Sequence, residues 1–216
     1  HKGEILGIGG LSECGMHEVG KALFGASFDR TGSVTLADGT EINDITTAIN
    51  HSIAYASKDR DNESIMLNSS IGDNITLPVL DRLQKGVYLS GKTLKKAANE
   101  QVQSLHIKCV SEEQYCTELS GGNKQKVAFA KWMGANCDIL ILDCPTRGID
   151  IGVKADMYKL IDEMKHAGKG IVMISEELVE LIGMSDRMII MKDGAIVKEV
   201  MRDPEVTDSQ LIEYII

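Results

Sequence analysis

The sequence predicts an α/β fold in which a mostly parallel sheet carries helices on both faces and a helical segment is inserted. Short apolar runs that indicate buried strands alternate with helical patterns, as in parallel sheets covered on both faces. Two Asp-Gly pairs indicate antiparallel hairpins. The middle of the chain has several helix signals and few strand signals.

The predicted parallel strands are four short apolar runs, three of which precede a helical pattern. Their continuous apolar character suits strands buried on both faces. The strands are Ile5–Ile8, Ile139–Leu142, Ile171–Ile174 and Met188–Met191, the neighbouring helices are Met16–Phe24, Val153–Met164 and Glu177–Ile182, and Thr207 can cap a short final helix.

Two hairpins are predicted at Asp-Gly pairs, which supply the positive φ that tight turns require. Asp38-Gly39 follows the short strand Ser33–Leu36, and Asp193-Gly194 separates Met188–Met191 from Ala195–Glu199. We therefore expect some antiparallel strand in the sheet.

The segment 71–135 is predicted to form a helical subdomain. Ser90 can cap a lysine-rich helix, and another helix is expected after Ser120. Segments 1–70 and 136–216 would then form the α/β core.

Composition excludes several classes of function. The 216 residues carry 32 acidic and 23 basic side chains, a formal charge of −9. This balance disfavours sequence-independent nucleic-acid binding, which depends on Lys and Arg. No apolar run is long enough to span a bilayer. The five cysteines are odd in number and scattered, which favours free thiols in a reducing cytoplasm over disulfides or a zinc site.

The segment after the first strand has the glycine spacing of a phosphate-binding loop, G-x-x-x-x-G-K-[ST]. In such a loop the backbone N–H groups cradle phosphate, the Lys reaches the β- and γ-phosphates, and the hydroxyl holds magnesium. Met16 stands at the Lys position and His17 at the hydroxyl position, and neither suits this chemistry. Taken alone, the spacing fits a plain strand–turn–helix equally well. The segment comprises Gly10, Leu11, Ser12, Glu13, Cys14, Gly15, Met16 and His17.

Glu13 places a negative charge where a phosphate would lie. Two positions of its carboxylate remain open. It fills the anion hole that the loop N–H groups would form, or it is simply solvated.

Two later segments also carry chemistry. In the first, Ser120 can cap a helix and two glycines let the backbone approach an anion closely. In the second, an apolar strand ends at Asp143, which can hold the water shell of a metal at the carboxyl edge of a sheet. Each piece alone could be a plain turn or a strand-end cap. The first segment reads Leu119, Ser120, Gly121, Gly122 and Asn123.

In this order, the loop and the two segments resemble the ABC transporter ATPase domain, with its signature and Walker B segments. The resemblance covers essentially the whole chain. It implies the P-loop NTPase, ABC ATPase fold, with a RecA-like core at 1–70 and 136–216 and the signature subdomain at 71–135. Leu119–Lys126 and Pro145–Asp150 are similar to segments of bacterial monosaccharide importers of the ribose and galactose type, with nucleoside importers as close relatives. Tyr55–Arg60 is similar to a segment of their second ATPase domain.

In that subfamily two ATPase domains lie in tandem, and the second typically has an altered P-loop. The abrupt start of the sequence at a strand therefore suggests an excised fragment that lacks the N-terminal antiparallel part.

The resemblance further implies a degenerate nucleotide site. Besides Met16 and His17, Lys58 stands at the position of the Q-loop Gln, Cys144 at that of the general-base Glu, and Glu176 at that of the switch His. A lost general base costs about 10²–10⁴ in rate. We expect this site to hydrolyse ATP poorly or not at all, with Asp143 a weak or lost magnesium ligand.

The intact signature implies a role in trans. In this family each nucleotide lies between the P-loop of one domain and the signature of the other. Ser120, Gly121 and Gly122 would then bind the γ-phosphate of ATP held by a partner domain, and Asp150 matches the D-loop Asp that contacts the partner.

The resemblance implies ATP and Mg in the assembled transporter and none bound to the isolated domain. The expected partners are another ATPase domain, membrane permease subunits gripped through Lys58–Asn74, and indirectly a periplasmic or lipid-anchored sugar-binding protein, with no nucleic acid. The location would be the cytoplasmic face of the plasma membrane. Three alternatives remain open: an active ATPase with divergent residues, a nucleoside importer domain, and a soluble ABC protein acting on DNA or ribosomes.

Overall fold

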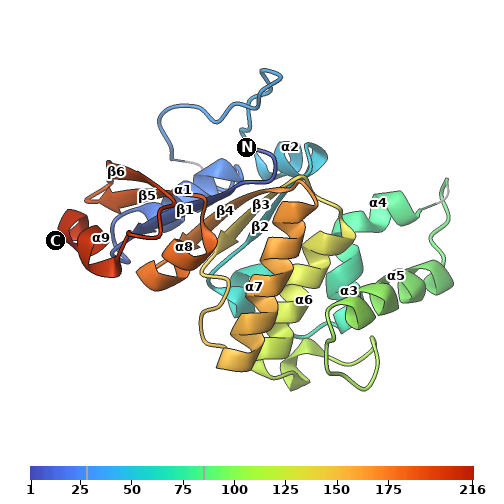
Figure 1. The fold of residues 1–216 in the computed structure, drawn as a ribbon. Coiled ribbons are helices and arrows are strands. Elements are labelled where there is room, and N and C mark those ends of the chain that lie inside the picture. Colours follow the sequence, from blue (N-terminus) through green and yellow to red (C-terminus); the bar gives the residue numbers. More distant parts are fainter. Residues whose placement is uncertain (28, 85) are drawn as a thin grey trace. The chain divides into compact units, whose positions relative to one another are not determined.

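The computed structural model describes residues 1–27, 29–84 and 86–216. Within these ranges the chain forms two compact units, which are described in turn (Figure 1). The first comprises His1–Tyr55, Asp138–Pro145 and Tyr158–Ile216, and the second comprises Ala56–Cys137 and Thr146–Met157.

The first unit is built on a six-stranded sheet in the order β2-β3-β4-β1-β5-β6. Strands β3, β4, β1 and β5 are parallel, and β6 pairs with β5 in the antiparallel sense. The prediction of a mostly parallel sheet with some antiparallel strand is confirmed. The strands are β1 (Ile5–Gly10), β2 (Ile53–Ala56), β3 (Ile139–Asp143), β4 (Gly170–Ser175), β5 (Arg187–Lys192) and β6 (Ala195–Met201).

Helices cover both faces of this sheet. On one face, a Cβ on Gly20 of α1 would lie 2.5 Å from Ile174 Cδ1. Ile8 is the register partner of Ile174 and therefore shares this face. On the other face, a Cβ on Gly9 would lie 2.5 Å from Leu181 Cδ1 of α8. The helices of this unit are α1 (Met16–Leu23), α2 (Ile45–Asn50), the second half of α7 (Ile151–His166), α8 (Leu178–Met184) and α9 (Asp208–Ile215).

Only one of the two predicted hairpins contributes strands to the sheet. Asp193-Gly194 joins β5 to β6 as expected. Around Asp38-Gly39 the turn forms, with a bridge between Thr35 and Glu41 and a hydrogen bond of 2.8 Å from the Leu36 N–H to the Thr40 carbonyl. The pairing is too short to make a strand, so the predicted strand Ser33–Leu36 is wrong. Its side chains are exposed or half-buried, and a short two-stranded ribbon without a buried apolar face is only marginally stable.

Two polar side chains fix where elements of the first unit begin. Thr207 caps α9 as predicted, in a capping box with Gln210. Asp186 accepts a hydrogen bond of 2.9 Å from the Ile5 N–H and another from the Lys165 ammonium. Although partial burial raises the pKa of the Asp186 carboxyl, these donors outweigh burial and hold the pKa below its usual value.

The second unit is helical, and α3, α5 and α6 lie side by side in it (Figure 1). Ser70 caps α3 through a capping box with Asp73. Helices follow Ser90 and Ser120 as predicted, but neither hydroxyl caps its helix. Instead, the Ser120 hydroxyl accepts a hydrogen bond of 3.0 Å from Asn123 Nδ2. The elements are η1 (Arg60–Ser64), α3 (Ile71–Thr76), η2 (Leu77–Val79), α4 (Leu80–Leu83), α5 (Gly91–Ser104), η3 (Cys116–Glu118), α6 (Gly121–Gly134) and the first half of α7.

The five cysteines are free thiols, as the sequence predicts. Among the helices of the described ranges, none combines the length and the apolar character needed to cross a bilayer.

Candidate functional site

The carboxyl ends of β3, β4 and β1 lie along one edge of the sheet, and polar residues follow each strand. The register places Asp143 opposite Ile174 of β4, and Ile174 opposite Ile8 of β1. The loop after β1, the pair Asp143-Cys144 and Glu176 therefore come together at this edge, where parallel sheets commonly bind ligands.

Both glycines of the loop after β1 are required by the backbone. Gly15 has a φ of +92°, in the left-handed region. A Cβ on Gly10 would lie 2.4 Å from the Met191 carbonyl oxygen and 2.5 Å from Cys14 Sγ. The local packing of this unit thus explains the glycine spacing without any ligand.

The two residues after Gly15 turn inward. Met16 has no exposed surface and belongs to the hydrophobic core. His17 is 6% exposed, and its ring faces the end of β3. Neither side chain offers a charge or a hydroxyl to the solvent side of the loop.

A buried hydrogen-bond network joins His17 to Asp143 of β3. The His17 Nδ1 lies 2.7 Å from Asp143 Oδ1, and its Nε2 lies 3.3 Å from Glu176 Oε1. The Tyr55 hydroxyl donates to the second Asp143 oxygen at 3.1 Å. Because Asp143 is only 1% exposed, these two donors replace the water that a carboxylate would otherwise need.

Cys144, the residue after Asp143, adds a sulfur atom beside the nitrogen of His17 and the oxygen of Asp143. It is buried, has a φ of +48° and donates its backbone N–H to the Ile174 carbonyl at 2.8 Å. Its Sγ, a His17 ring nitrogen and an Asp143 oxygen all lie within 4.8 Å of one another. The structure thus groups three candidate metal ligands from two distant segments of sequence.

Glu13 is exposed, and its carboxylate accepts no hydrogen bond from a loop N–H in the part of the chain that the structure describes. Of the two positions left open, the solvated one is therefore confirmed. The alternative in which Glu13 fills the anion hole is wrong, because a carboxylate exposed to water keeps its hydration without those amides.

The segment Leu119–Asn123 surrounds the N-terminus of α6 in the second unit. Leu119 is buried, whereas Ser120 is exposed. A Cβ on Gly122 would lie 2.9 Å from Val153 Cγ2, so packing requires this glycine. A Cβ on Gly121 would meet nothing nearer than an ordinary 3.5 Å contact, so packing within the described chain does not.

Two further predicted site residues also belong to the second unit. Asp150 is exposed, and its Oδ1 accepts a hydrogen bond of 3.0 Å from the Val153 N–H at the start of α7. Lys58 is half-buried between β2 and η1. Asp150 thus has a structural role, capping α7, that the sequence analysis did not assign.

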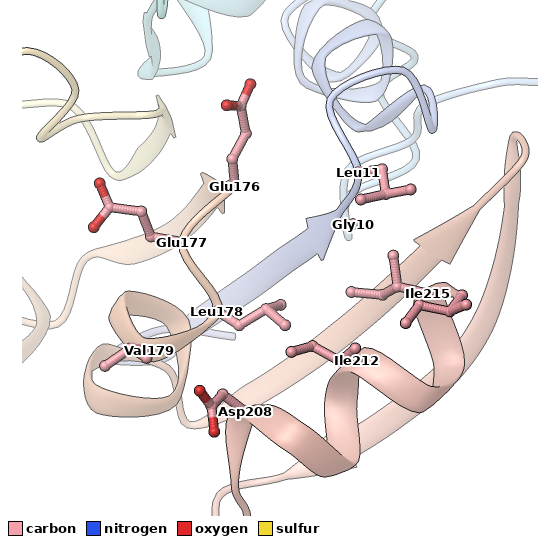
Figure 2. Close-up of a pocket in the computed structure, with 10 residues that line it drawn as sticks. Gly10, Leu11, Glu176, Glu177, Leu178, Val179, Asp208, Ile212 and Ile215 are labelled. Carbon is pink, nitrogen blue, oxygen red and sulfur yellow. The ribbon is translucent and has the colours of Figure 1, made fainter.

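A pocket of about 560 Å³ lies beside the carboxyl edge, on the side of α8 and α9 (Figure 2). Figure 2 shows the Leu178 and Ile212 side chains directed toward each other, and the Glu176 side chain turned away from them. Carboxylates at its rim make this apolar pocket unsuited to a polyphosphate. Its lining residues are Gly10, Leu11, Glu176, Glu177, Leu178, Val179, Asp208, Ile212, Ile215 and Ile216.

Sequence reasoning missed Tyr55 and the pairing of His17 with Asp143. Tyr55 lies in β2, which is adjacent to β3 in the sheet and was not among the predicted strands. The ring of Tyr55 also stacks on Phe24 of the same unit, with centroids 5.6 Å apart. Cysteine spacing bears only on sites with several thiols, so it does not reveal a cluster that contains a single thiol.

Comparisons with known proteins identify the family of this chain. A sequence model of the family described as ABC transporter matches residues 1–147. The ribose import ATP-binding protein RbsA of Clostridium perfringens is 43% identical over 204 residues, 94% of this chain and 41% of that protein. The RbsA of Caldanaerobacter subterraneus is 39% identical over 213 residues, 98% of this chain and 43% of that protein. The chain thus spans about two fifths of the length of these curated relatives.

Solved structures resemble the chain in fold. A dimeric ATP-binding cassette in a post-hydrolysis state, bound to ADP and Pi, matches with a TM-score of 0.80 and 20% identity over 94% of this chain and 87% of that one. A nucleotide-free ATP-binding cassette from an ABC transporter also matches with a TM-score of 0.80, at 18% identity over 100% of this chain and 89% of that one. The predicted ATPase fold is confirmed.

Proposed function

The chain belongs to the ABC transporter family, and from this premise we propose that it is an ATP-binding domain of a bacterial importer of ribose or a related monosaccharide. Its own P-loop site would be degenerate. Its signature segment, Leu119–Asn123, would complete the ATP site of a partner domain. The curated relatives named above, both described as ribose import ATP-binding proteins, support the sugar class.

One observation carries this proposal: Met16 and His17, at the two altered P-loop positions, face the core, while Ser120 of the signature is exposed. Met16 is fully buried and His17 is hydrogen-bonded to Asp143. Ser120 is exposed at the N-terminus of a 14-residue helix. The residues that would act on the chain's own nucleotide are thus engaged elsewhere, whereas those that would act in trans are accessible.

The residues at the loop do not fit a magnesium nucleotide. Magnesium prefers oxygen ligands in octahedral geometry, whereas the position of the P-loop hydroxyl holds an imidazole. The candidate magnesium carboxylate, Asp143, already accepts hydrogen bonds from His17 and Tyr55. No ammonium stands at position 16 to balance phosphate charge. We therefore assign no hydrolytic step to this loop.

The signature, by contrast, suits an anion supplied from outside the chain. The first N–H groups of a helix have no partner within the helix, and the helix dipole favours negative charge there. The Ser120 hydroxyl does not cap the first turn of α6. Gly121 carries no side chain, so another surface can approach the backbone closely at this position.

The further parts of the proposal follow from the family. The partners would be a second ATPase domain, in the same polypeptide or a homologous one, and membrane permease subunits on the cytoplasmic face of the plasma membrane. A sugar-binding protein would act through the permease. ATP and Mg would serve the assembled importer, and segments 1–70 with 136–216 and 71–135 would form the core and the signature subdomain.

The first test is titration calorimetry of Mg-ATP into this chain, with an ABC ATPase domain that has a complete P-loop as the control. We expect no measurable heat at millimolar nucleotide from this chain and clear binding by the control. Micromolar binding to this chain would refute the degenerate site and favour the active ATPase.

The second test measures ATP hydrolysis by the assembled importer in proteoliposomes. Ser120→Arg should lower the rate by about 10²–10³-fold, the usual effect of removing one donor to transition-state charge. The matched control is Ser104→Arg, the same substitution at an exposed serine at the end of α5. Equal rates for the two variants would refute the role in trans.

A further inference from the structure

The cluster of His17, Asp143 and Cys144 has the donor atoms of a transition-metal site. A ring nitrogen, a carboxylate oxygen and a thiol sulfur lie within 4.8 Å of one another, and all three side chains are buried. All three residues belong to the first unit. We propose that these residues bind Zn²⁺, or a divalent transition metal of the same preference, at the place where an active ABC ATPase would hold magnesium.

The chemistry of the donors selects the metal. Zinc is bound by imidazole nitrogen, thiolate sulfur and carboxylate oxygen, whereas magnesium takes oxygen ligands. The thiol of Cys144 and the ring of His17 therefore favour zinc over magnesium. With three protein ligands, a tetrahedral zinc would keep a fourth position for water.

The outer contacts of the cluster match those of histidine metal sites. A ligating His usually donates its other ring N–H to a carboxylate, which fixes the tautomer and the ring orientation. Here the ring nitrogen opposite the cluster, His17 Nε2, lies 3.3 Å from Glu176 Oε1. The Tyr55 hydroxyl holds the second oxygen of Asp143 at 3.1 Å. Two of the three ligands are thus already oriented.

The distances require only small movements. Zinc bonds of about 2.0–2.3 Å place tetrahedral ligand atoms about 3.3–3.8 Å apart. The cluster ranges from 2.7 Å, between His17 Nδ1 and Asp143 Oδ1, to at most 4.8 Å. If rotation of these side chains moves their ligand atoms by about 1 Å, the separations fall within this tetrahedral range.

Metal binding also changes the protons carried by the ligands. The metal replaces the hydrogen bond between His17 Nδ1 and Asp143, so the ring proton resides on Nε2, where Glu176 accepts it. The Cys144 thiol releases one proton to the solvent and binds as thiolate. One proton is therefore released per metal ion if the His17 ring starts neutral, and two are released if both ring nitrogens start protonated.

The test uses Co²⁺ as a spectroscopic substitute for Zn²⁺ in the chelator-stripped chain. We expect one Co²⁺ per chain, a sulfur-to-cobalt charge-transfer band, tetrahedral d–d bands, displacement by Zn²⁺ and no displacement by millimolar Mg²⁺. Cys144→Ser should abolish the charge-transfer band. Cys137→Ser is the matched control, since Cys137 is 6% exposed and Cys144 8%, and it should retain the band.

A second pair of variants keeps the test decisive if Cys144→Ser fails to fold. Glu176→Gln alters only an exposed side chain that orients His17 from outside, and should weaken Co²⁺ binding by about 10–100-fold. Glu177→Gln is the control, because Figure 2 shows the Glu177 side chain pointing in a different direction from that of Glu176. Absence of stoichiometric Co²⁺ binding, a charge-transfer band that survives Cys144→Ser, or equal affinities of the two Gln variants would each overturn the proposal.

Discussion

Replacing His17 by Ala should destabilise the chain strongly, because it leaves a buried carboxylate without its closest partner. Asp143 is 1% exposed and accepts hydrogen bonds from His17 Nδ1 at 2.7 Å and from the Tyr55 hydroxyl at 3.1 Å. Removing the partner of a buried carboxylate leaves its charge uncompensated, which costs about 3–5 kcal/mol. With a urea slope of about 2 kcal/mol/M, the unfolding midpoint should fall by about 2 M.

A double-mutant cycle separates the charge from the loss of packing. In the Asp143→Asn background the same His17→Ala change leaves a neutral amide unpaired, which costs only about 1–3 kcal/mol. The two substitutions should therefore couple by about 2 kcal/mol, well above the error for independent sites. Urea unfolding followed by circular dichroism, in the presence of a chelator, measures all four corners of the cycle.

The control is His166→Ala, at an exposed histidine on the last turn of α7, which should change the free energy of unfolding by no more than about 0.5 kcal/mol. The reasoning is refuted if His17→Ala costs less than about 1 kcal/mol. It is equally refuted if the cost is the same with Asp and with Asn at position 143, since the carboxylate would then not depend on the imidazole.

Three other predictions address packing, pH and thiol chemistry. Gly122→Ala should lower the free energy of unfolding in urea by about 1–3 kcal/mol, because its Cβ would lie 2.9 Å from Val153. Gly121→Ala should change it by no more than about 1 kcal/mol. The reverse order of the two costs would contradict this packing. Because the pKa of Asp186 is lowered in the folded chain, its carboxylate stabilises the fold at neutral pH, and this stabilisation is lost as the pH falls below about 4. Asp186→Asn should therefore make the free energy of unfolding depend less on pH on the acid side. An unchanged pH profile would contradict this. Burial raises the pKa of the Cys116 thiol to about 11, so this thiol should react slowly. Mass spectrometry should find Cys116 unlabelled by a thiol reagent at pH 8 until urea unfolds the chain. Labelling at the rate of a free cysteine would contradict its burial.

The strands and most helices could be predicted because their signals are local. The run Ile5–Ile8 is apolar throughout, and β1 is buried on both faces of the sheet. Capping was predicted less well. A serine before a helix signals an N-cap, but the Ser120 hydroxyl bonds to Asn123 instead, and nothing in the order of residues distinguishes these two outcomes. At Asp38-Gly39 the turn forms but the predicted strand Ser33–Leu36 does not, because turn chemistry does not report whether the flanking segments find an apolar surface.

The candidate site divides in the same way. The sequence identifies Met16 and His17 as the wrong residues for phosphate and magnesium, since that judgement needs only their chemistry. It does not reveal where these side chains go. The contact between His17 and Asp143 joins positions 126 residues apart, and only the register of the parallel strands brings them together. The cluster with Cys144 is therefore a property of the fold that residue spacing could not show.

The loop after β1 also shows which part of a motif is informative. Its glycines are the residues that most suggest a phosphate site, yet Gly15 is required by its φ of +92° and Gly10 by the Met191 carbonyl, 2.4 Å from where a Cβ would lie. A chain with this strand–turn–helix geometry needs both glycines whether or not it binds phosphate. The glycine spacing therefore bears on the fold alone. The identities at positions 16 and 17, together with the partners of Asp143, are what bear on nucleotide chemistry, and all of them favour a loop that keeps the backbone of a P-loop without its function.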